Sequence, residues 1–281
     1  MKKSILIILL TCIAIVSCDS KKQVKTEKET KVEIAPELIK NLKVDHFNLW
    51  TKKPEEFKKK LVKAGFTVIP DSLRPPHVGQ GTQGKYINFL NMYFEIISVY
   101  DEEELMANQK QNPLLDFETR KNYEKNGASP FSISLQMKAY DASKIPFETV
   151  KYHQSWMSSD SVNIESAKSS KTNFSEPSVF VVYPEISSDD FATIEDLVKI
   201  PEEYAMWREF FKHSNGAKRV TNMKVHMVRK HEVSDVIPVL NGIEGLQIID
   251  DTSHFIEVDF DHKIQNIKLD FRPDFPVIIN L

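Results

Sequence analysis

The sequence predicts an α+β fold, built from repeated βαβββ modules that form a cupped, mixed β-sheet with flanking helices. Runs of alternating apolar and polar residues are typical of half-buried strands, and apolar residues at helical spacing separate them. The order of strand, helix and further strands occurs three times, near 43–100, 131–186 and 220–275. One such module would leave an apolar face uncovered, so we expect neighbouring modules to join around a shared pocket.

The first module has the clearest pattern. In VDHFNLW, alternation places His46, Asn48 and Trp50 on one face of a strand. Pro54 then fits the first turn of a helix, because the missing N–H has no partner there in any case. The strands that complete this module are expected in FTVIP (66–70), KYINFLN (85–91) and MYFEIISVY (92–100).

The later elements follow from the same patterns. Residues 101–128 and parts of 193–213 are expected to be helical. FSISLQM opens the second module as a strand, and VTNMKVHMVRK opens the third. The remaining strands are expected in 161–170, 177–186, 246–250, 254–260 and 264–271.

The N-terminus predicts a lipoprotein signal peptide over residues 1–17. Lys2 and Lys3 precede an apolar run that ends in Ile-Val-Ser-Cys at Cys18. An apolar run of about a dozen residues is too short for a stable bilayer span. The ending resembles a bacterial lipobox, which implies cleavage before Cys18 and lipidation of its thiol. The alternative is an ordinary secretory signal with an incidental cysteine.

Residues 18–41 predict a flexible tether, because they are charged, rich in Thr and nearly free of aromatic residues. The folded domain would then comprise 42–281 and lie outside the cytoplasm, held at a membrane of the bacterial cell envelope through Cys18. The other cysteine, Cys12, also lies in the leader. The mature domain therefore has no disulfide, no cysteine metal site and no thiol nucleophile.

The overall composition limits the kinds of partner that we expect. The chain has 281 residues, of which 41% are hydrophobic and 27% charged, with a net charge of -3. The sequence shows no basic stripe with interleaved aromatic residues, so nucleic acid is not an expected partner. Glycine is scarce, at 8 residues, which argues against a Gly-rich phosphate-binding loop. A small-molecule ligand is the expected partner, and the oligomeric state is left open.

Four short motifs resemble a known family. Asp-His on the first strand, Gly-Phe at the end of the helix, HVGQGT in the following loop and YFEI on the last strand resemble the glyoxalase-like branch of the vicinal oxygen chelate superfamily. That superfamily includes glyoxalase I, bleomycin-resistance proteins and extradiol dioxygenases. The segment 213–227 also looks like the one that opens the last module in this branch. Together the matches extend in outline over 43–230.

The resemblance implies a divalent metal, Zn, Ni, Mn or Fe, held by residues on the first and fourth strands of paired modules. His46 and Glu95 occupy those positions in the first module. The second module departs from the family, because its first strand offers Ser132, Ser134 or Gln136 and no histidine. In the last module, Asn222 or His226 and Glu257 are the candidates, and Glu257 completes the expected metal set.

Several side chains are candidates for binding or catalysis. Glu95 is a metal ligand or base, and His77, in a loop with two glycines, is a general acid or base. The alternative for His77 is a tight turn whose imidazole faces water. Asn48, Thr82 and Lys224 are expected to contact the ligand together with His46. Lys224 could instead form an ion pair with Glu257.

Two functions follow from these residues. In the first, the protein binds a small organic molecule and transforms it by metal-assisted lyase, isomerase or dioxygenase chemistry. In the second, it is a non-catalytic envelope protein that binds a ligand or another protein. A metal-free polar pocket, lined by His46 and by a neighbouring Glu to which it is hydrogen-bonded, would favour the second function.

Overall fold

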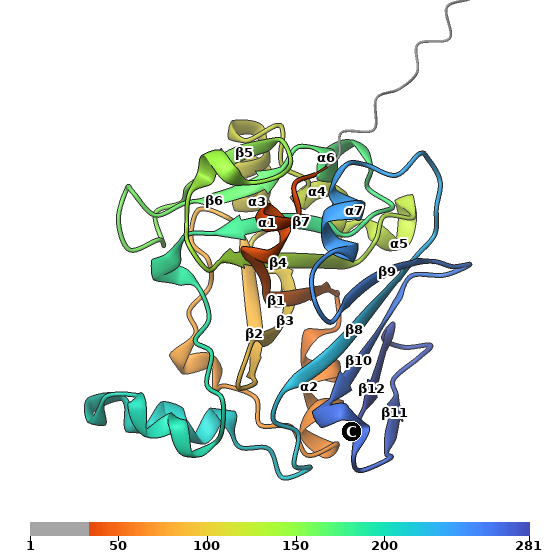
Figure 1. Ribbon diagram of the computed structural model, residues 1–281. Helices are drawn as coiled ribbons and strands as arrows, with labels where there is room; N and C mark the ends of the chain where they lie inside the picture. The colour runs from red at the N-terminus through yellow and green to blue at the C-terminus, as the bar shows by residue number, and fades with distance from the viewer. Residues whose placement is uncertain (1–33) are drawn as a thin grey trace, which may run out of the picture. The chain divides into compact units, whose positions relative to one another are not determined.

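The computed structural model describes residues 34–281 and contains two mixed β-sheets. The predicted signal peptide (1–17) and Cys18 lie outside the described residues, so both stay predictions. The strands of the larger sheet are β1 (Leu42–Trp50), β2 (Thr82–Asn88), β3 (Tyr93–Val99), β4 (Phe131–Met137), β5 (Thr149–Tyr152), β6 (Ile164–Ala167) and β7 (Ser178–Val182). Across the sheet they follow the order β2-β3-β1-β4-β7-β6-β5 (Figure 1).

The larger sheet consists of two halves with matching strand order. At its centre β1 and β4 pair antiparallel. On one side β1 pairs parallel with β3, and β3 antiparallel with β2; on the other, β4 pairs parallel with β7, and β7 antiparallel with β6. The α+β fold is therefore confirmed. We call β1, β3 and β2 the first half, and β4, β7, β6 and β5 the second half.

The third predicted module forms a sheet of its own. Its strands are β8 (Val220–Met227), β9 (Leu246–Asp250), β10 (Phe255–Phe260), β11 (Lys268–Asp270) and β12 (Val277–Asn280), in the order β11-β12-β10-β8-β9. Here α7 (Val236–Asn241) connects two strands that pair parallel, β8 and β9, and β10 takes the other side of β8. This order differs from that of the two halves of the larger sheet.

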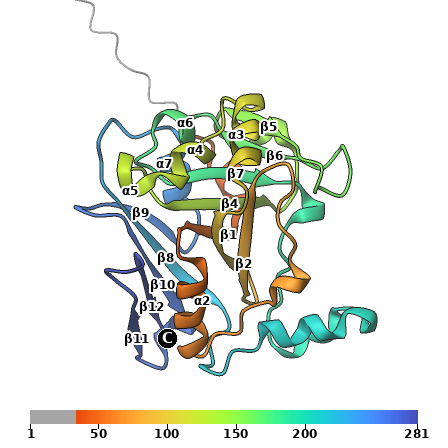
Figure 2. The ribbon, with the colours of Figure 1, turned by 180° about the vertical axis from the view of Figure 1, so that it is seen from behind.

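The remaining helices are short. They are α1 (Pro36–Lys40), α2 (Pro54–Lys63), α3 (Glu102–Gln111), α4 (Phe117–Lys121), α5 (Tyr123–Asn126) and α6 (Ser169–Thr172). The region 193–213 is helical in part, as 3₁₀ segments at Glu195–Lys199 and Glu202–Phe211. FTVIP is not a regular strand, although the Ile69 N–H donates to the Tyr86 carbonyl at 2.9 Å. Seen from behind, α2 lies beside the smaller sheet (Figure 2), where Phe57 stacks on Phe275 at 4.3 Å.

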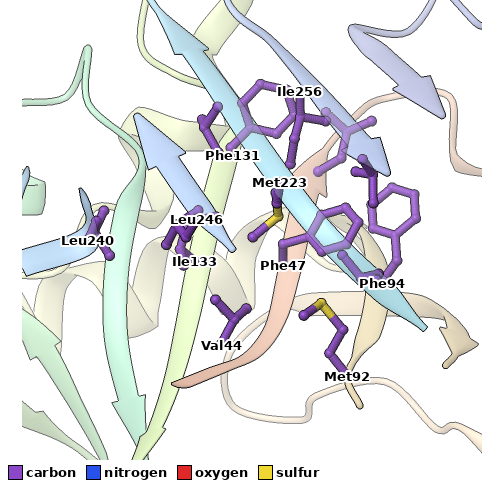
Figure 3. Packing of buried hydrophobic residues seen from close by; sticks show 14 of the residues in the cluster. Val44, Phe47, Met92, Phe94, Phe131, Ile133, Met223, Leu240, Leu246 and Ile256 are labelled. Atoms are coloured by element: carbon purple, nitrogen blue, oxygen red, sulfur yellow. The ribbon is translucent and has the colours of Figure 1, made fainter. Parts of the chain in front are cut away.

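The main core lies between the two sheets. It includes Phe47 and Phe94 of the larger sheet, stacked at 4.5 Å, together with Met223 and Ile256 of the smaller one (Figure 3). A β-bulge in β1 shifts the register between Val44 and His46. The extra residue brings both Val44 and Phe47 to the core face, although three positions separate them. The other face of the sheet is thereby left free for polar side chains.

The end of the expected tether, residues 34–41, falls within the part of the chain that the structure describes. Residues 36–40 form α1, and Ile34 and Ile39 pack partly buried against the core. Two apolar side chains within this charged segment account for the difference, because they can be buried against the domain. Within residues 34–281, no helix combines the length and the apolar character that crossing a bilayer requires.

Candidate functional site

A cavity of about 540 Å³ lies against the face of the larger sheet that points away from the core. All seven strands of the sheet contribute side chains to it, among them those of His46, Tyr86, Glu95, Ser132 and Phe180. The walls come from loops and helix ends. They include Arg74 to His77, Leu115 to Phe117, Trp156, Glu185 to Asp189, and Phe211.

His46 enters the cavity from β1, and Asp45 holds its ring. Neighbouring residues of a regular strand point to opposite faces, but the bulge at this position lets the two side chains meet. His46 Nδ1 lies 2.5 Å from Asp45 Oδ1, and the ring stacks on Tyr93 at 4.1 Å. The fully buried Asp45 also accepts the Ser188 backbone N–H, at 2.6 Å. A carboxylate on Nδ1–H fixes the tautomer, which makes Nε2 the basic nitrogen.

Glu95 and Asn48 supply two hydrogen-bond acceptors side by side. They are register partners on β3 and β1, and both are about 95% buried, with exposed fractions of 4% and 5%. Glu95 Oε1 and Asn48 Oδ1 have no hydrogen-bond partner among the described residues. Gly84 of β2 makes room for this arrangement, because a Cβ there would collide with Glu95 Oε1 and the Tyr86 hydroxyl.

His77 belongs to a chain of hydrogen bonds that ends at Tyr86. Its Nδ1 lies 3.0 Å from Thr82 Oγ1, and its Nε2 lies 2.8 Å from the Tyr86 hydroxyl. Burial lowers the pKa of His77, opposed by the Glu95 carboxylate. Burial and the same carboxylate raise the pKa of Tyr86 well above its usual value. The neutral forms are therefore favoured at both groups near pH 7, and the hydrogen bond joins a neutral imidazole to a neutral hydroxyl.

Arg74 reaches the cavity between two aromatic rings. Its guanidinium carbon lies 4.7 Å from the Tyr86 ring centroid and 5.0 Å from that of Trp207. Both rings are within the usual distance of a cation–π contact, and the buried Nε of Arg74 has no partner among the described residues. Trp156 Nε1 is a second buried donor without a partner in residues 34–281. These donors complement the acceptors of Glu95 and Asn48.

The second half of the sheet contributes little charge. Across the central strand pair, His46 is opposite Ser134 and Asn48 is opposite Ser132. On β7 the lining residues are Ser178, Phe180 and Val182. The positions that are polar and ionisable in the first half therefore carry hydroxyl or apolar side chains in the second.

The structure brings together only part of the predicted site. His46, Asn48, His77 and Glu95 line the cavity, and Thr82 lies behind His77. Lys224 and Glu257 do not line it. They are cross-strand partners on β8 and β10 of the smaller sheet, where their apolar neighbours in sequence turn into the core. Their register brings opposite charges together across two strands, but no Lys224–Glu257 contact within 4.0 Å occurs, so the ion-pair alternative stays a prediction.

The donor set does not match a three-ligand metal site. Zinc sites use at least three protein ligands, and iron and nickel sites with nitrogen and oxygen ligands need a comparable set. Among residues 34–281, no group of three His, Cys, Asp or Glu side chains lies close enough to hold an ion. His46 and Glu95 face the cavity, whereas His226 bonds Asp251 on the smaller sheet at 2.9 Å.

Four functional residues were missed by reasoning from sequence. Asp45, Arg74, Tyr86 and Tyr93 all hold or line the polar part of the cavity. The Asp-His pair was visible as a motif, but regular alternation predicted opposite faces for its members. Tyr86 lies two positions from Asn88 on β2, and Tyr93 lies two positions from Glu95 on β3. Residues at this spacing share one face of a strand, so alternation could have identified both tyrosines. Arg74 lies in a loop and gave no signal.

Comparisons with known proteins identify no family for this chain. No family model matches the sequence. A search of curated proteins gives no match. Among solved structures, the chain is similar to a hypothetical protein from Staphylococcus aureus, with 13% identity and a TM-score of 0.46, over 85% of this chain and 97% of that one. At that distance the similarity carries no argument about function.

Proposed function

We propose that the protein binds a small organic molecule in the cavity against the larger sheet. The observation that carries the proposal is that three residues lining one cavity each have a buried polar atom without a hydrogen-bond partner among residues 34–281: Glu95 Oε1, Asn48 Oδ1 and Trp156 Nε1. A buried polar group that lacks a hydrogen bond typically destabilises a protein by about 1–3 kcal/mol. A ligand that satisfies these atoms would recover that free energy on binding.

The size and lining of the cavity support the same conclusion. Its volume of about 540 Å³ is within the usual range for small-molecule sites. Aromatic side chains, including Trp50, Tyr93 and Phe180, surround the polar groups. A mostly apolar wall with a few convergent polar groups is the usual form of a small-molecule site.

The resemblance to the vicinal oxygen chelate superfamily is part of the proposal. The two halves of the sheet, each with a first strand beside its last, support it. So does the arrangement of His46 and Glu95 on one face. The predicted lipid anchor at Cys18 would place this binding site at the cell envelope, and metabolic labelling with a fatty-acid analogue, compared between the wild type and Cys18→Ser, tests that part.

A second candidate is acid–base catalysis on the bound molecule. It is favoured by His46, whose Nε2 is left as a base by Asp45, and by the contact between His77 and Tyr86 at 2.8 Å. A base and an acid on opposite sides of one ligand can move a proton between two of its atoms. Incubation of a bound ligand in D₂O, followed by NMR, would show deuterium at its acidic carbon, and the signal should vanish in His46→Gln.

We derive no step through a metal, because no three His, Cys, Asp or Glu side chains among the described residues lie close enough together to hold an ion. Metal analysis of the purified protein tests this directly. Uptake at one equivalent, abolished in both His46→Ala and Glu95→Gln, would restore the metal-assisted reaction that the family resemblance implies. Uptake unaffected by these substitutions would place any metal elsewhere.

The binding proposal is tested with a fragment collection. Ligand-observed NMR should find binders to the wild type that fail to bind Ser132→Phe, because a phenyl group at this central position would occupy the cavity. Lys224→Phe is the matched control, since it adds the same group on the smaller sheet, away from the cavity. Equal binding to Ser132→Phe and the wild type would overturn the proposal.

A further inference from the structure

Among the side chains that line the cavity, one carboxylate and one guanidinium lack an ion-pair partner within residues 34–281. Glu95 and Arg74 both line it, and neither belongs to any salt bridge within residues 34–281. The other lining carboxylates differ. Asp116 is paired with Arg120 at 2.6 Å, and Glu185 and Asp189 are exposed at the rim, where water screens them.

The environment of Arg74 selects what it can bind. The rings of Tyr86 and Trp207 lie 4.7 and 5.0 Å from its guanidinium carbon, and the planar edge of the group is the part that can form paired hydrogen bonds with a ligand. That edge presents parallel N–H groups, which match the two oxygens of a carboxylate. The buried and unpartnered Nε belongs to this edge.

The environment of Glu95 selects the opposite kind of group. Its Oε1 and the Oδ1 of Asn48 come from register partners on adjacent strands, and within residues 34–281 neither atom has a partner that meets hydrogen-bond geometry, although the Tyr86 hydroxyl lies near Glu95 and bonding to its carboxylate contributes to the raised Tyr86 pKa. An ammonium group has several N–H donors and a positive charge, so it can serve both acceptors and neutralise the carboxylate. A neutral hydroxyl has one donor and could serve only one of them.

The two charges are close enough to act on a single molecule. Glu95 raises and Arg74 lowers the pKa of the same Tyr86 hydroxyl, which shows that both lie within electrostatic reach of it. They have the same opposed effects on the pKa of Tyr93. Trp50 and Phe180 provide an apolar surface against which the rest of a ligand can pack.

We propose that the ligand is a zwitterionic amino acid or a derivative of one, with an apolar side chain. Its carboxylate binds the edge of Arg74, its ammonium group binds Glu95 and Asn48, and its side chain packs against the aromatic wall. This inference rests on the proposed function, since it names the ligand class of the same cavity. It goes further in requiring both charged groups on one molecule.

The test uses matched sets of small molecules that share one apolar body. Phenylalanine, 3-phenylpropanoate and 2-phenylethylamine carry both groups, only the carboxylate, and only the ammonium group. Leucine and tryptophan, with their own single-charge analogues, extend the test to other bodies. Isothermal titration with the full chain should show that at least one zwitterion binds roughly tenfold or more tighter than both of its analogues.

Substitutions then assign each group to its partner. Arg74→Gln should remove the advantage of the zwitterion over the amine, and Glu95→Gln should remove its advantage over the acid. Arg74→Lys keeps the charge without the planar edge, so it should restore only part of the affinity. Lys224→Gln, away from the cavity, should change none of these affinities. Circular dichroism and thermal unfolding check that each variant is folded.

The outcomes separate this inference from the proposed function. If an acid or amine binds as tightly as its zwitterion, or if no zwitterion binds at all, the ligand class is overturned. Fragments that bind the wild type but not Ser132→Phe would still support a small-molecule site in that case. If fragments also fail to bind in the cavity, the proposed function fails with it.

Discussion

The two halves of the larger sheet have matching strand order but different chemistry. In the first half, β1 and β3 supply His46, Asn48 and Glu95 to the cavity. In the second half, the positions opposite His46 and Asn48 are Ser134 and Ser132, and β7 supplies Phe180. The strand order follows from backbone pairing and tolerates these exchanges, whereas the chemistry depends on individual side chains.

The halves also differ in what supports them. Behind the second half, Arg120 is fully buried and bonds Asp116 through Nε at 2.6 Å. Its other nitrogens donate to the carbonyls of Ser129, Ser170, Phe174 and Glu176. At the edge of the first half, His213 is held between the Thr67 N–H and the Asn88 carbonyl, at 2.9 and 2.8 Å. One half therefore depends on a buried charge and the other on a buried neutral imidazole.

The largest effect is expected from Arg120→Met, which would break the support of the second half. It leaves the Asp116 carboxylate buried without its charged partner and removes a donor from four carbonyls, of which that of Phe174 keeps the Ser129 N–H. Breaking a buried ion pair in this way typically lowers the free energy of unfolding by about 3–5 kcal/mol. Urea denaturation measures it, with the exposed Lys125→Met as the control. A loss no greater than that of the control would show that water replaces these bonds.

The contribution of His213 to the free energy of unfolding should depend on pH. Burial lowers the pKa of His213 from 6.5 to about 4, because both ring nitrogens are already used in the neutral form. Between pH 6.5 and 4 the unfolded chain binds a proton at this residue and the folded chain does not. Stability is therefore fully present above pH 6.5 and is lost as the pH falls, by roughly 3 kcal/mol from this residue.

The neutral variant His213→Gln isolates this contribution. Glutamine offers one donor and one acceptor but cannot gain the proton, so its unfolding free energy should fall less steeply between pH 6.5 and 4. Carboxylates elsewhere titrate in both proteins, and the difference between the two curves removes them. Parallel curves would mean that His213 gains its proton without loss of its hydrogen bonds.

The fold was predictable to the extent that it depends on alternating patterns. VDHFNLW placed His46, Asn48 and Trp50 on one face correctly, since each of these positions lies beyond the bulge. The third module has similar patterns, yet it forms a separate sheet. Periodicity shows which face of a strand is buried, but not which strand lies next to it. Strand order was therefore beyond the reach of these patterns.

The candidate site was predictable only where it lies on strands. Glu95 and His46 could be identified from position and residue type, whereas Arg74 comes from a loop whose course no local pattern specifies. Glu257 was assigned to the same site because it lies on a strand of the expected third module. The different order of the smaller sheet places it with Lys224 instead. The assignment of Glu257 was therefore wrong because the strand order differs from the expected one, although a glutamate is a suitable ligand.

The smallest effect, and the most direct comparison of the halves, comes from Asn48→Ala and Ser132→Ala. These two residues are opposite each other on β1 and β4, both line the cavity, and their exposed fractions are 5% and 4%. Asn48 Oδ1 is buried without a partner among residues 34–281, and Ser132 has no such atom. We expect Asn48→Ala to weaken ligand binding by about tenfold, which is about 1.4 kcal/mol, and Ser132→Ala by less than about twofold.

The same pair should behave differently in stability. Removing the amide of Asn48 also removes a buried acceptor that is unsatisfied without ligand, so the free energy of unfolding should stay level or rise despite the lost packing. Binding and stability would then change in opposite directions, which is the relation expected of a residue retained for its function. Titration calorimetry and urea denaturation on both variants measure the two quantities.

If both substitutions weaken binding equally, the second half shares the ligand chemistry that we assign to the first. If Asn48→Ala destabilises the protein without changing affinity, Asn48 supports the sheet and does not contact the ligand.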